Sequence, residues 1–143
     1  MDSTNNNKYL FSLDIKVRDY ELDSEGIVNN AIYQHYLELT RHEFCTATGF
    51  SFDEMRREGI IPVVNRIEID YRRPLVSGDV MESKLWVEER GVRFIFHQDI
   101  FHKASGDVVV NAKVSIVCLE DGKLSRGERL HEYFRPFLEA AKQ

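Results

Sequence analysis

Residues 29–49 read NNAIYQHYLELTRHEFCTATG, and this stretch decides the fold. Its apolar and small side chains recur at helical spacing and form one stripe. That stripe consists of Tyr33, Leu37, Thr40, Phe44 and Ala47 and is widened by Ile32, Tyr36 and Leu39. The pattern predicts a helix from about Asn30 to Thr48 that is buried over much of its circumference and ends at Gly49. A helix buried in this way needs a sheet wrapped around it.

The segments on either side of the predicted helix supply that sheet. Alternation of polar and apolar residues predicts five strands, at residues 9–17, 65–72, 80–90, 92–102 and 108–119. The connections between the last three strands are so short that antiparallel hairpins are expected. Two further helices are predicted, a short one from Ser51 to Glu58 and an amphipathic one over residues 130–138, with Pro136 breaking or restarting it.

The composition is typical of one globular domain. The chain has 143 residues, of which 43% are hydrophobic and 30% charged, so one core is expected over residues 8–143. Residues 1–7 are polar and aperiodic, and we expect them to be disordered. The net charge of −5, with acidic and basic residues interspersed, argues against a nucleic-acid partner, which would need a concentrated basic face.

The sequence also predicts where the protein works. No apolar run approaches the roughly 20 residues that cross a bilayer, and the polar start lacks the regions of a signal peptide. The two cysteines, Cys45 and Cys118, fall in buried patterns and are expected to be free thiols. We therefore expect a cytoplasmic protein with no membrane partner.

A polar loop before the predicted helix carries the residues that suggest chemistry. The loop contains Asp23 and Gly26, and the helix follows at Asn29 and Asn30. Backbone N–H groups at a helix start are unpaired and lie at the positive end of the helix dipole, so they can hold the oxyanion that forms when a carbonyl is attacked. A carboxylate a few residues upstream would face that carbonyl as nucleophile or as general base. The pattern alone leaves open that Asp23 only supports the loop.

Two segments resemble a known family. Residues 17–41, VRDYELDSEGIVNNAIYQHYLELTR, look like the signature of the hydroxybenzoyl-CoA thioesterase family of hotdog proteins. Residues 69–79, IDYRRPLVSGD, resemble the strand and turn that follow the central helix in that family. The resemblance implies an α+β hotdog fold, in which a curved antiparallel sheet wraps around a long central helix. It also implies an acyl-CoA thioesterase that needs no metal or redox cofactor.

The resemblance further implies roles for individual residues. The family's catalytic carboxylate falls on Asp23, and the amide that polarises the thioester carbonyl falls on the N–H of Asn30. Asn29 and Tyr33 would lie beside the acyl group. Sites in the family lie between subunits, so we expect a homodimer or homotetramer in which the partner's residues 65–71 contribute to the pocket.

Basic residues near predicted strand ends are candidates for the phosphates of coenzyme A, because phosphates need charge-assisted donors. Among them we expect Arg72 and Arg93 to bind substrate. The five histidines are dispersed, and no metal site is expected.

Several alternatives remain open at this stage. Acyl carrier protein could replace coenzyme A as the thiol carrier, or the chain could bind an acyl-CoA or another metabolite without catalysis. A hotdog hydratase fits less well, because such enzymes generally require a histidine beside the acid and none lies between Asp23 and Asn30. A second branch of hotdog thioesterases places its carboxylate on the long helix, where Glu38 occupies a comparable position.

Overall fold

The computed structural model describes residues 8–142, and side chains as far as residue 138. The expected disorder of residues 1–7 lies outside the described residues. The elements along the chain are β1 (Phe11–Lys16), a 3-10 helix η2 (Asp19–Glu21), α1 (Ile32–Ala47), α2 (Phe52–Arg57), β2 (Ile60–Tyr71), β3 (Val80–Arg90), β4 (Arg93–His102), β5 (Val108–Glu120), β6 (Lys123–Leu124) and α3 (Glu128–Lys142).

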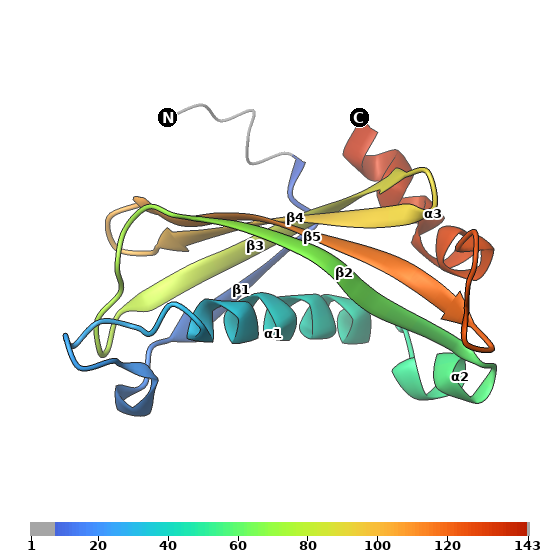
Figure 1. Cartoon of the computed structure of the whole chain (residues 1–143). Coiled ribbons are helices and arrows are strands. Elements are labelled where there is room, and N and C mark those ends of the chain that lie inside the picture. The colour runs from blue at the N-terminus through green and yellow to red at the C-terminus, as the bar shows by residue number, and fades with distance from the viewer. Residues whose placement is uncertain (1–7, 143) are drawn as a thin grey trace.

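One curved antiparallel sheet holds all the strands. Its order is β1-β3-β4-β5-β2, and the short β6 pairs with the end of β5. The sheet curves around α1, which lies along its concave face, while α2 and α3 lie towards the same end of the molecule (Figure 1). The predicted architecture, a curved antiparallel sheet around a long central helix, is confirmed.

The core forms where α1 meets the concave face of the sheet. Leu37 and Phe44 of α1 are almost completely buried, and they pack with strand residues such as Leu85 and Phe96. The buried face of the helix also includes Arg41 and Cys45, whereas Leu39 and Ala47, which were expected on that face, are exposed. The helix is therefore rotated slightly from the predicted orientation.

Polar groups on the buried face of α1 are paired with the loop and the sheet. The Tyr36 hydroxyl donates to Glu21 Oε1 over 2.8 Å, and the Thr40 hydroxyl lies 2.7 Å from that of Ser83. Because an unpaired buried polar group destabilises the folded state, these contacts define how the helix sits against the strands. The Glu21 contact also ties the loop before α1 to the second turn of the helix.

Two strand and helix predictions need correction. Strand β2 begins at Ile60, five residues earlier than expected, and its pairing with β5 shifts at a bulge between Val64 and Arg66. Asn65 is the extra residue of this bulge, so it does not continue the apolar face of Ile67 as the alternation predicted. Helix α3 continues through Pro136 instead of breaking there. The carbonyl that loses its partner belongs to Glu132, which is exposed, so water can hydrogen-bond to it.

The start of α1 also differs from the prediction. Regular helix begins at Ile32, and Asn30 lies in the turn before it. The predicted cap of the short helix is confirmed, since the Ser51 hydroxyl accepts a hydrogen bond from Glu54 N. Among the described residues, no helix has the length and apolar character needed to cross a membrane.

The contact between Tyr36 and Glu21 predicts the effect of a conservative substitution. Tyr36→Phe removes the hydroxyl and leaves the buried Glu21 carboxylate with fewer donors, so the free energy of unfolding should fall by about 1–3 kcal/mol. Urea denaturation of both proteins measures the difference. A Tyr20→Phe variant serves as control, because the Tyr20 side chain is exposed. Equal midpoints for Tyr36→Phe and wild type would contradict the prediction.

The buried thiol of Cys45 predicts a pH dependence of stability. Burial raises the pKa of Cys45 from 9.0 to about 12. The thiol of the unfolded chain therefore loses its proton first, and the free energy of unfolding should decrease as the pH rises from 9 to 12, while the full contribution is present below pH 9. Urea denaturation of wild type and Cys45→Ala at pH 8 and pH 10.5 isolates this effect. Parallel losses of stability in the two proteins would disprove it.

Candidate active site

Hydrogen bonds made by Asp23 organise the loop before α1. Asp23 N–H donates to Ile27 O, and Asp23 Oδ1 accepts from Glu25 N at 2.8 Å and more weakly from Ile27 N at 3.4 Å. Gly26 provides the positive φ of 79° that this tight turn requires. The second carboxylate oxygen, Oδ2, accepts no hydrogen bond from the side chains and backbone that the structure describes. The turn thus orients the carboxylate while leaving one oxygen available.

The turn at the start of α1 leaves one backbone N–H available. Asn29 accepts hydrogen bonds from two neighbouring backbone N–H groups. Its side-chain Oδ1 accepts from Ala31 N and its carbonyl accepts from Ile32 N, both at 2.9 Å. The N–H of Asn30 donates to no residue in the described part of the chain. It lies at the N-terminal end of a helix of 16 residues, where the helix dipole favours negative charge. Asn29 therefore pairs two backbone amides at the start of α1, and Asn30 offers the free donor.

Asp23 and Asn30 lie on the same cleft. This cleft has a volume of about 380 Å³. It is lined by Asp23, Ile27, Val28, Asn30, Tyr33, Tyr71, Arg72, Arg73 and Pro74. A carboxylate, an unpaired backbone donor and aromatic walls are the groups that acyl transfer requires, since they can activate a nucleophile, hold an oxyanion and position an acyl group.

Two tyrosines form the aromatic wall of the cleft. The Tyr33 ring is buried and meets the Tyr71 ring edge-on, with centroids 5.4 Å apart. The Tyr71 hydroxyl donates to the carbonyl of Asn30 over 3.0 Å, which ties β2 to the start of α1. Burial raises the pKa of Tyr33, so its hydroxyl stays neutral. The resemblance implied Tyr33 at the site, whereas residues 65–71 were expected to reach the pocket from the partner subunit; here Tyr71 of the same chain lines the cleft.

The structure separates the two predicted cationic residues. Arg72 lines the cleft, and its Nε donates to Asn111 Oδ1 over 3.0 Å while most of its side chain is exposed. Arg93 instead begins β4 and pairs with Arg90 at the opposite end of the sheet, so it lies away from the cleft of its own chain. Arg73, the neighbour of Arg72, also lines the cleft but is held by Ser105 and Asp107.

The alternative carboxylate lies elsewhere on α1. Glu38 is exposed and borders a separate cavity together with His42 and Cys45. It does not line the cleft that contains Asp23. Asn29, which was expected beside the acyl group, is exposed and is likewise absent from the lining of that cleft.

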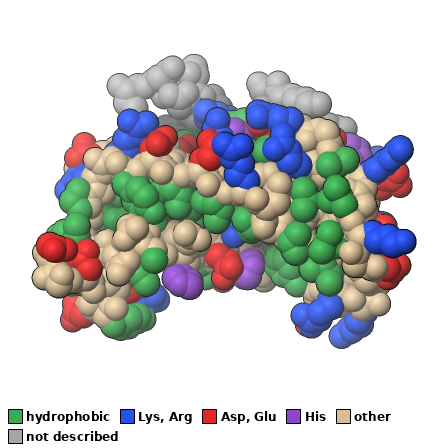
Figure 2. Space-filling model, in the orientation of Figure 1, with side chains coloured by type: hydrophobic (Ala, Val, Ile, Leu, Met, Phe, Trp, Pro, Cys, Tyr) green, Lys and Arg blue, Asp and Glu red, His purple; other side chains and the backbone are tan. Residues whose placement is uncertain are grey.

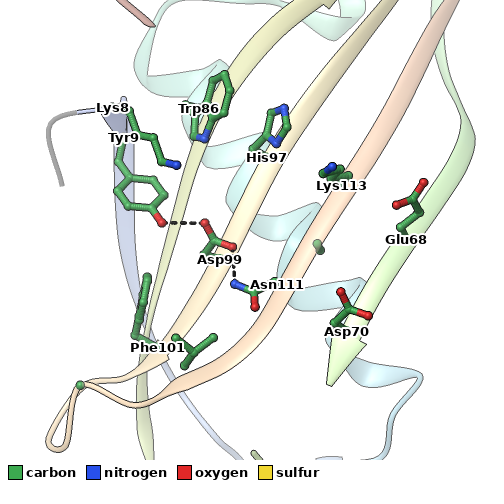
Figure 3. A pocket seen from close by; sticks show the side chains of 13 residues that line it. Lys8, Tyr9, Glu68, Asp70, Trp86, His97, Asp99, Phe101, Asn111 and Lys113 are labelled. Carbon is green, nitrogen blue, oxygen red and sulfur yellow. Dashed lines mark hydrogen bonds between the residues drawn. The ribbon is translucent and has the colours of Figure 1, made fainter. Parts of the chain in front are cut away.

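A larger cavity of about 500 Å³ lies on the outer face of the sheet, away from α1. Its central carboxylate, Asp99, accepts hydrogen bonds from the Tyr9 hydroxyl and from Asn111 Nδ2 (Figure 3). Both oxygens of Asp99 are therefore engaged, and none of the described residues that line this cavity belongs to α1, α2 or α3. We accordingly place the candidate site at the smaller cleft. Within residues 8–142, no three histidine, cysteine or acidic side chains are grouped closely enough to hold a metal ion.

Comparison with known proteins identifies the family to which the chain belongs. The sequence profile of the Thioesterase-like superfamily matches residues 17–136. The long-chain acyl-CoA thioesterase FadM of Escherichia coli is 36% identical over 107 residues, which cover 74% of this chain and 80% of that protein. The chloroplastic acyl-acyl carrier protein thioesterase ATL3 of Arabidopsis thaliana is 34% identical over 110 residues, or 76% of this chain. The aligned part spans only 58% of the plant protein's length.

Solved structures agree with the sequence comparison. The crystal structure of a hypothetical protein from Aquifex aeolicus superposes with a TM-score of 0.78 at 30% identity, covering 86% of this chain and 98% of that one. The 1,4-dihydroxy-2-naphthoyl-CoA thioesterase Slr0204 of Synechocystis has a TM-score of 0.82 at 16% identity, which is a likeness of fold alone. With a profile match over residues 17–136 and a central helix enclosed by a curved antiparallel sheet, this chain belongs to the hotdog-fold proteins of the thioesterase-like superfamily.

Proposed function

We propose that this protein hydrolyses acyl-CoA thioesters to the free acid and the thiol of coenzyme A, with Asp23 as the catalytic carboxylate. The observation that carries the proposal is that Asp23 and the unpaired N–H of Asn30 line one cleft at the start of α1. Relatives named as acyl-CoA thioesterases, among them FadM, support the reaction class.

The geometry suggests how the reaction proceeds. The thioester carbonyl oxygen accepts from Asn30 N–H, where the helix dipole stabilises the negative charge that develops on attack. Asp23 either attacks the carbonyl carbon, giving an anhydride that water then hydrolyses, or removes a proton from the attacking water. The carbon–sulfur bond breaks in both routes, and the sulfur leaves as a thiolate. Tyr33 and Tyr71 flank the acyl group.

The carrier of the acyl group is proposed to be coenzyme A. Arg72, exposed at the cleft, supplies the positive charge that a phosphate of the nucleotide part would need. Arg93 lies at the other end of the sheet, and for that reason it is not included in the proposed site. Acyl carrier protein is the second candidate carrier, since its phosphopantetheine arm has the same thioester and the relative ATL3 is named for that substrate.

We further infer that the enzyme works as a homo-oligomer with sites at the subunit interface. Strand β2 is at the edge of the sheet and exposes Ile61, Val64 and Tyr71, a combination that favours pairing with another chain. Hydrophobic side chains are abundant on the face where α1 and β2 lie, as Figure 2 shows. Because Tyr71 belongs both to this edge and to the cleft, a partner docked there would help to enclose the substrate.

The catalytic role of Asp23 predicts a large loss of turnover. Asp23→Asn keeps the size of the side chain and an oxygen that can accept from Glu25 N, so the loop should still fold, but it cannot act as base or nucleophile. Thiol release from a panel of aryl, short-chain and long-chain acyl-CoA substrates should fall by roughly 10²-fold to 10⁴-fold. Glu25→Gln, a substitution of an exposed carboxylate in the same loop, is the matched control and should keep normal turnover.

The panel also tests the competing assignments. Near-normal turnover by Asp23→Asn, together with a large loss in Glu38→Gln, would move the catalytic role to the helix. Binding of acyl-CoA by wild type without thiol release, for every substrate and for the same acyl chains on acyl carrier protein, would favour the non-catalytic binder instead.

The proposed phosphate contact predicts a substrate-dependent effect of Arg72. Arg72→Gln removes the charge, so KM for an acyl-CoA should rise by about 10-fold, the effect of losing one charge-assisted contact of roughly 1.5 kcal/mol. The same acyl group on N-acetylcysteamine, which carries no phosphate, should be hydrolysed by the variant and by wild type with similar KM. Equal changes for both substrates would contradict a phosphate contact.

A further inference from the structure

The cavity that Glu38 borders lies beside α1, beyond the middle of the helix. Its volume is about 290 Å³, close to the lower end of the range for small-molecule pockets. Most of its lining is apolar or aromatic and comes from α1, α2, β2 and α3. The lining residues used below are Arg41, Glu38, Val64, Phe96 and Phe134.

One charged group is buried in this apolar cavity. Arg41 is only 7% exposed, and its guanidinium donates through Nη1 to Gln98 Oε1 over 3.0 Å. This is its one hydrogen bond with residues 8–138, and none of the carboxylates described in that range forms an ion pair with it. Burial lowers the pKa of Arg41, while the charge of Glu38 one turn earlier acts in the opposite direction. Ser115 Oγ is the one fully buried side-chain nitrogen or oxygen without a partner among the described residues, so the remaining guanidinium donors keep accessible surface and can meet an acceptor in the cavity.

An apolar track on β2 runs from the candidate active site towards this cavity. Tyr71, at the cleft, shares one face of β2 with Ile69 and Ile67, both half-buried. The bulge at Asn65 keeps Val64 on the same face, because Val64 pairs with Ile116 and Ile67 with Val114. Val64 then lines the cavity. The exposed apolar surface of β2 therefore joins the two sites along the same side of α1.

We propose that this cavity receives the distal end of the acyl group and that Arg41 binds a carboxylate there, so that the preferred substrates are ω-carboxyacyl thioesters. The inference rests on the proposed hydrolysis at Asp23 and names its substrate class. The apolar track accommodates the methylene chain, and the guanidinium matches a carboxylate in charge and in planar, bidentate geometry. The ligand would supply the acceptors that the chain does not.

The helix length sets the expected size of the acyl group. Arg41 is nine residues after Ile32, where the regular helix begins, or about 14 Å along the axis, and the Arg41 side chain points back towards the helix start. Because consecutive carbons of an extended chain advance by somewhat less than one bond length of about 1.5 Å, an acyl group of roughly 8 to 12 carbons spans the distance between the two donors.

A carboxylate from a second copy of the chain is the main competing acceptor. Glu38 is exposed on α1 and could reach Arg41 of a neighbouring subunit. The buried, apolar surroundings of Arg41 favour the substrate, because the cavity beside it has room for a chain end. The experiment therefore measures substrate selectivity and subunit association in the same proteins.

The test compares ω-carboxyacyl-CoA with unsubstituted acyl-CoA of the same length, from 6 to 16 carbons, using full-length wild type and Arg41→Met. Wild type should favour the carboxylated substrate by about 10-fold to 100-fold in kcat/KM near 8 to 12 carbons, the effect of a charge-assisted contact of roughly 1.5–3 kcal/mol. Arg41→Met should lose this preference and retain or improve hydrolysis of the unsubstituted chain. Arg41→Lys, which keeps the charge, should retain part of the preference.

The outcomes separate this inference from the proposed function. Hydrolysis of unsubstituted chains by wild type without a preference for the carboxylated ones would overturn the role of Arg41 and leave the thioesterase proposal standing. Weaker subunit association of Arg41→Met and Glu38→Gln in sedimentation, with unchanged selectivity, would assign Arg41 to the interface and also overturn it. Absence of hydrolysis for every substrate would reject both proposals. The wild-type comparison tests the proposed substrate class even if the variants fail to fold.

Discussion

The burial of α1 against the concave face of the sheet is the constraint on which the other features depend. The helix carries polar groups on its buried side, and each must find a partner there. Tyr36 bonds to Glu21 and Thr40 to Ser83, so the helix has one favourable rotation relative to the strands. That rotation brings the start of α1 to the cleft with Asp23 and directs Arg41 into a separate cavity.

The loop that holds Asp23 is organised by the same contacts. Glu21 accepts from Tyr36 through its side chain and from Asn29 N–H through its carbonyl, so one residue connects the loop, the residues before α1 and the second turn of the helix. Asn29 in turn satisfies the amides of Ala31 and Ile32. The free donor at Asn30 is therefore a consequence of how its neighbours are paired, and the loop positions a carboxylate beside it.

Strand β2 links chemistry with assembly. As an edge strand it has unpaired backbone groups along one side, and its concave face is only partly covered by α1. The bulge at Asn65 keeps apolar side chains on that face over the length of the strand, from Tyr71 to Val64. The same strip of surface is thus available for an acyl chain and for a partner subunit, which is consistent with a substrate enclosed between the two.

Much of the fold and part of the site could be predicted from the sequence, because helix and strand periods are local properties. The central helix and the strands along the chain were recognised in this way, whereas the expectation that Asp23, Asn30 and Tyr33 form the site came from the resemblance of residues 17–41 to a known family. The tertiary structure alone decided the rest. The strand register places Arg93 at the far end of the sheet, and the Asn29 side chain accepts a hydrogen bond from Ala31 N. The bulge at Asn65 changes which residues share the apolar face of β2. The burial of Arg41, with Gln98 as the one hydrogen-bond partner of its guanidinium among the described residues, could not be foreseen either, since which groups surround a buried charge depends on contacts between residues that are distant in the chain.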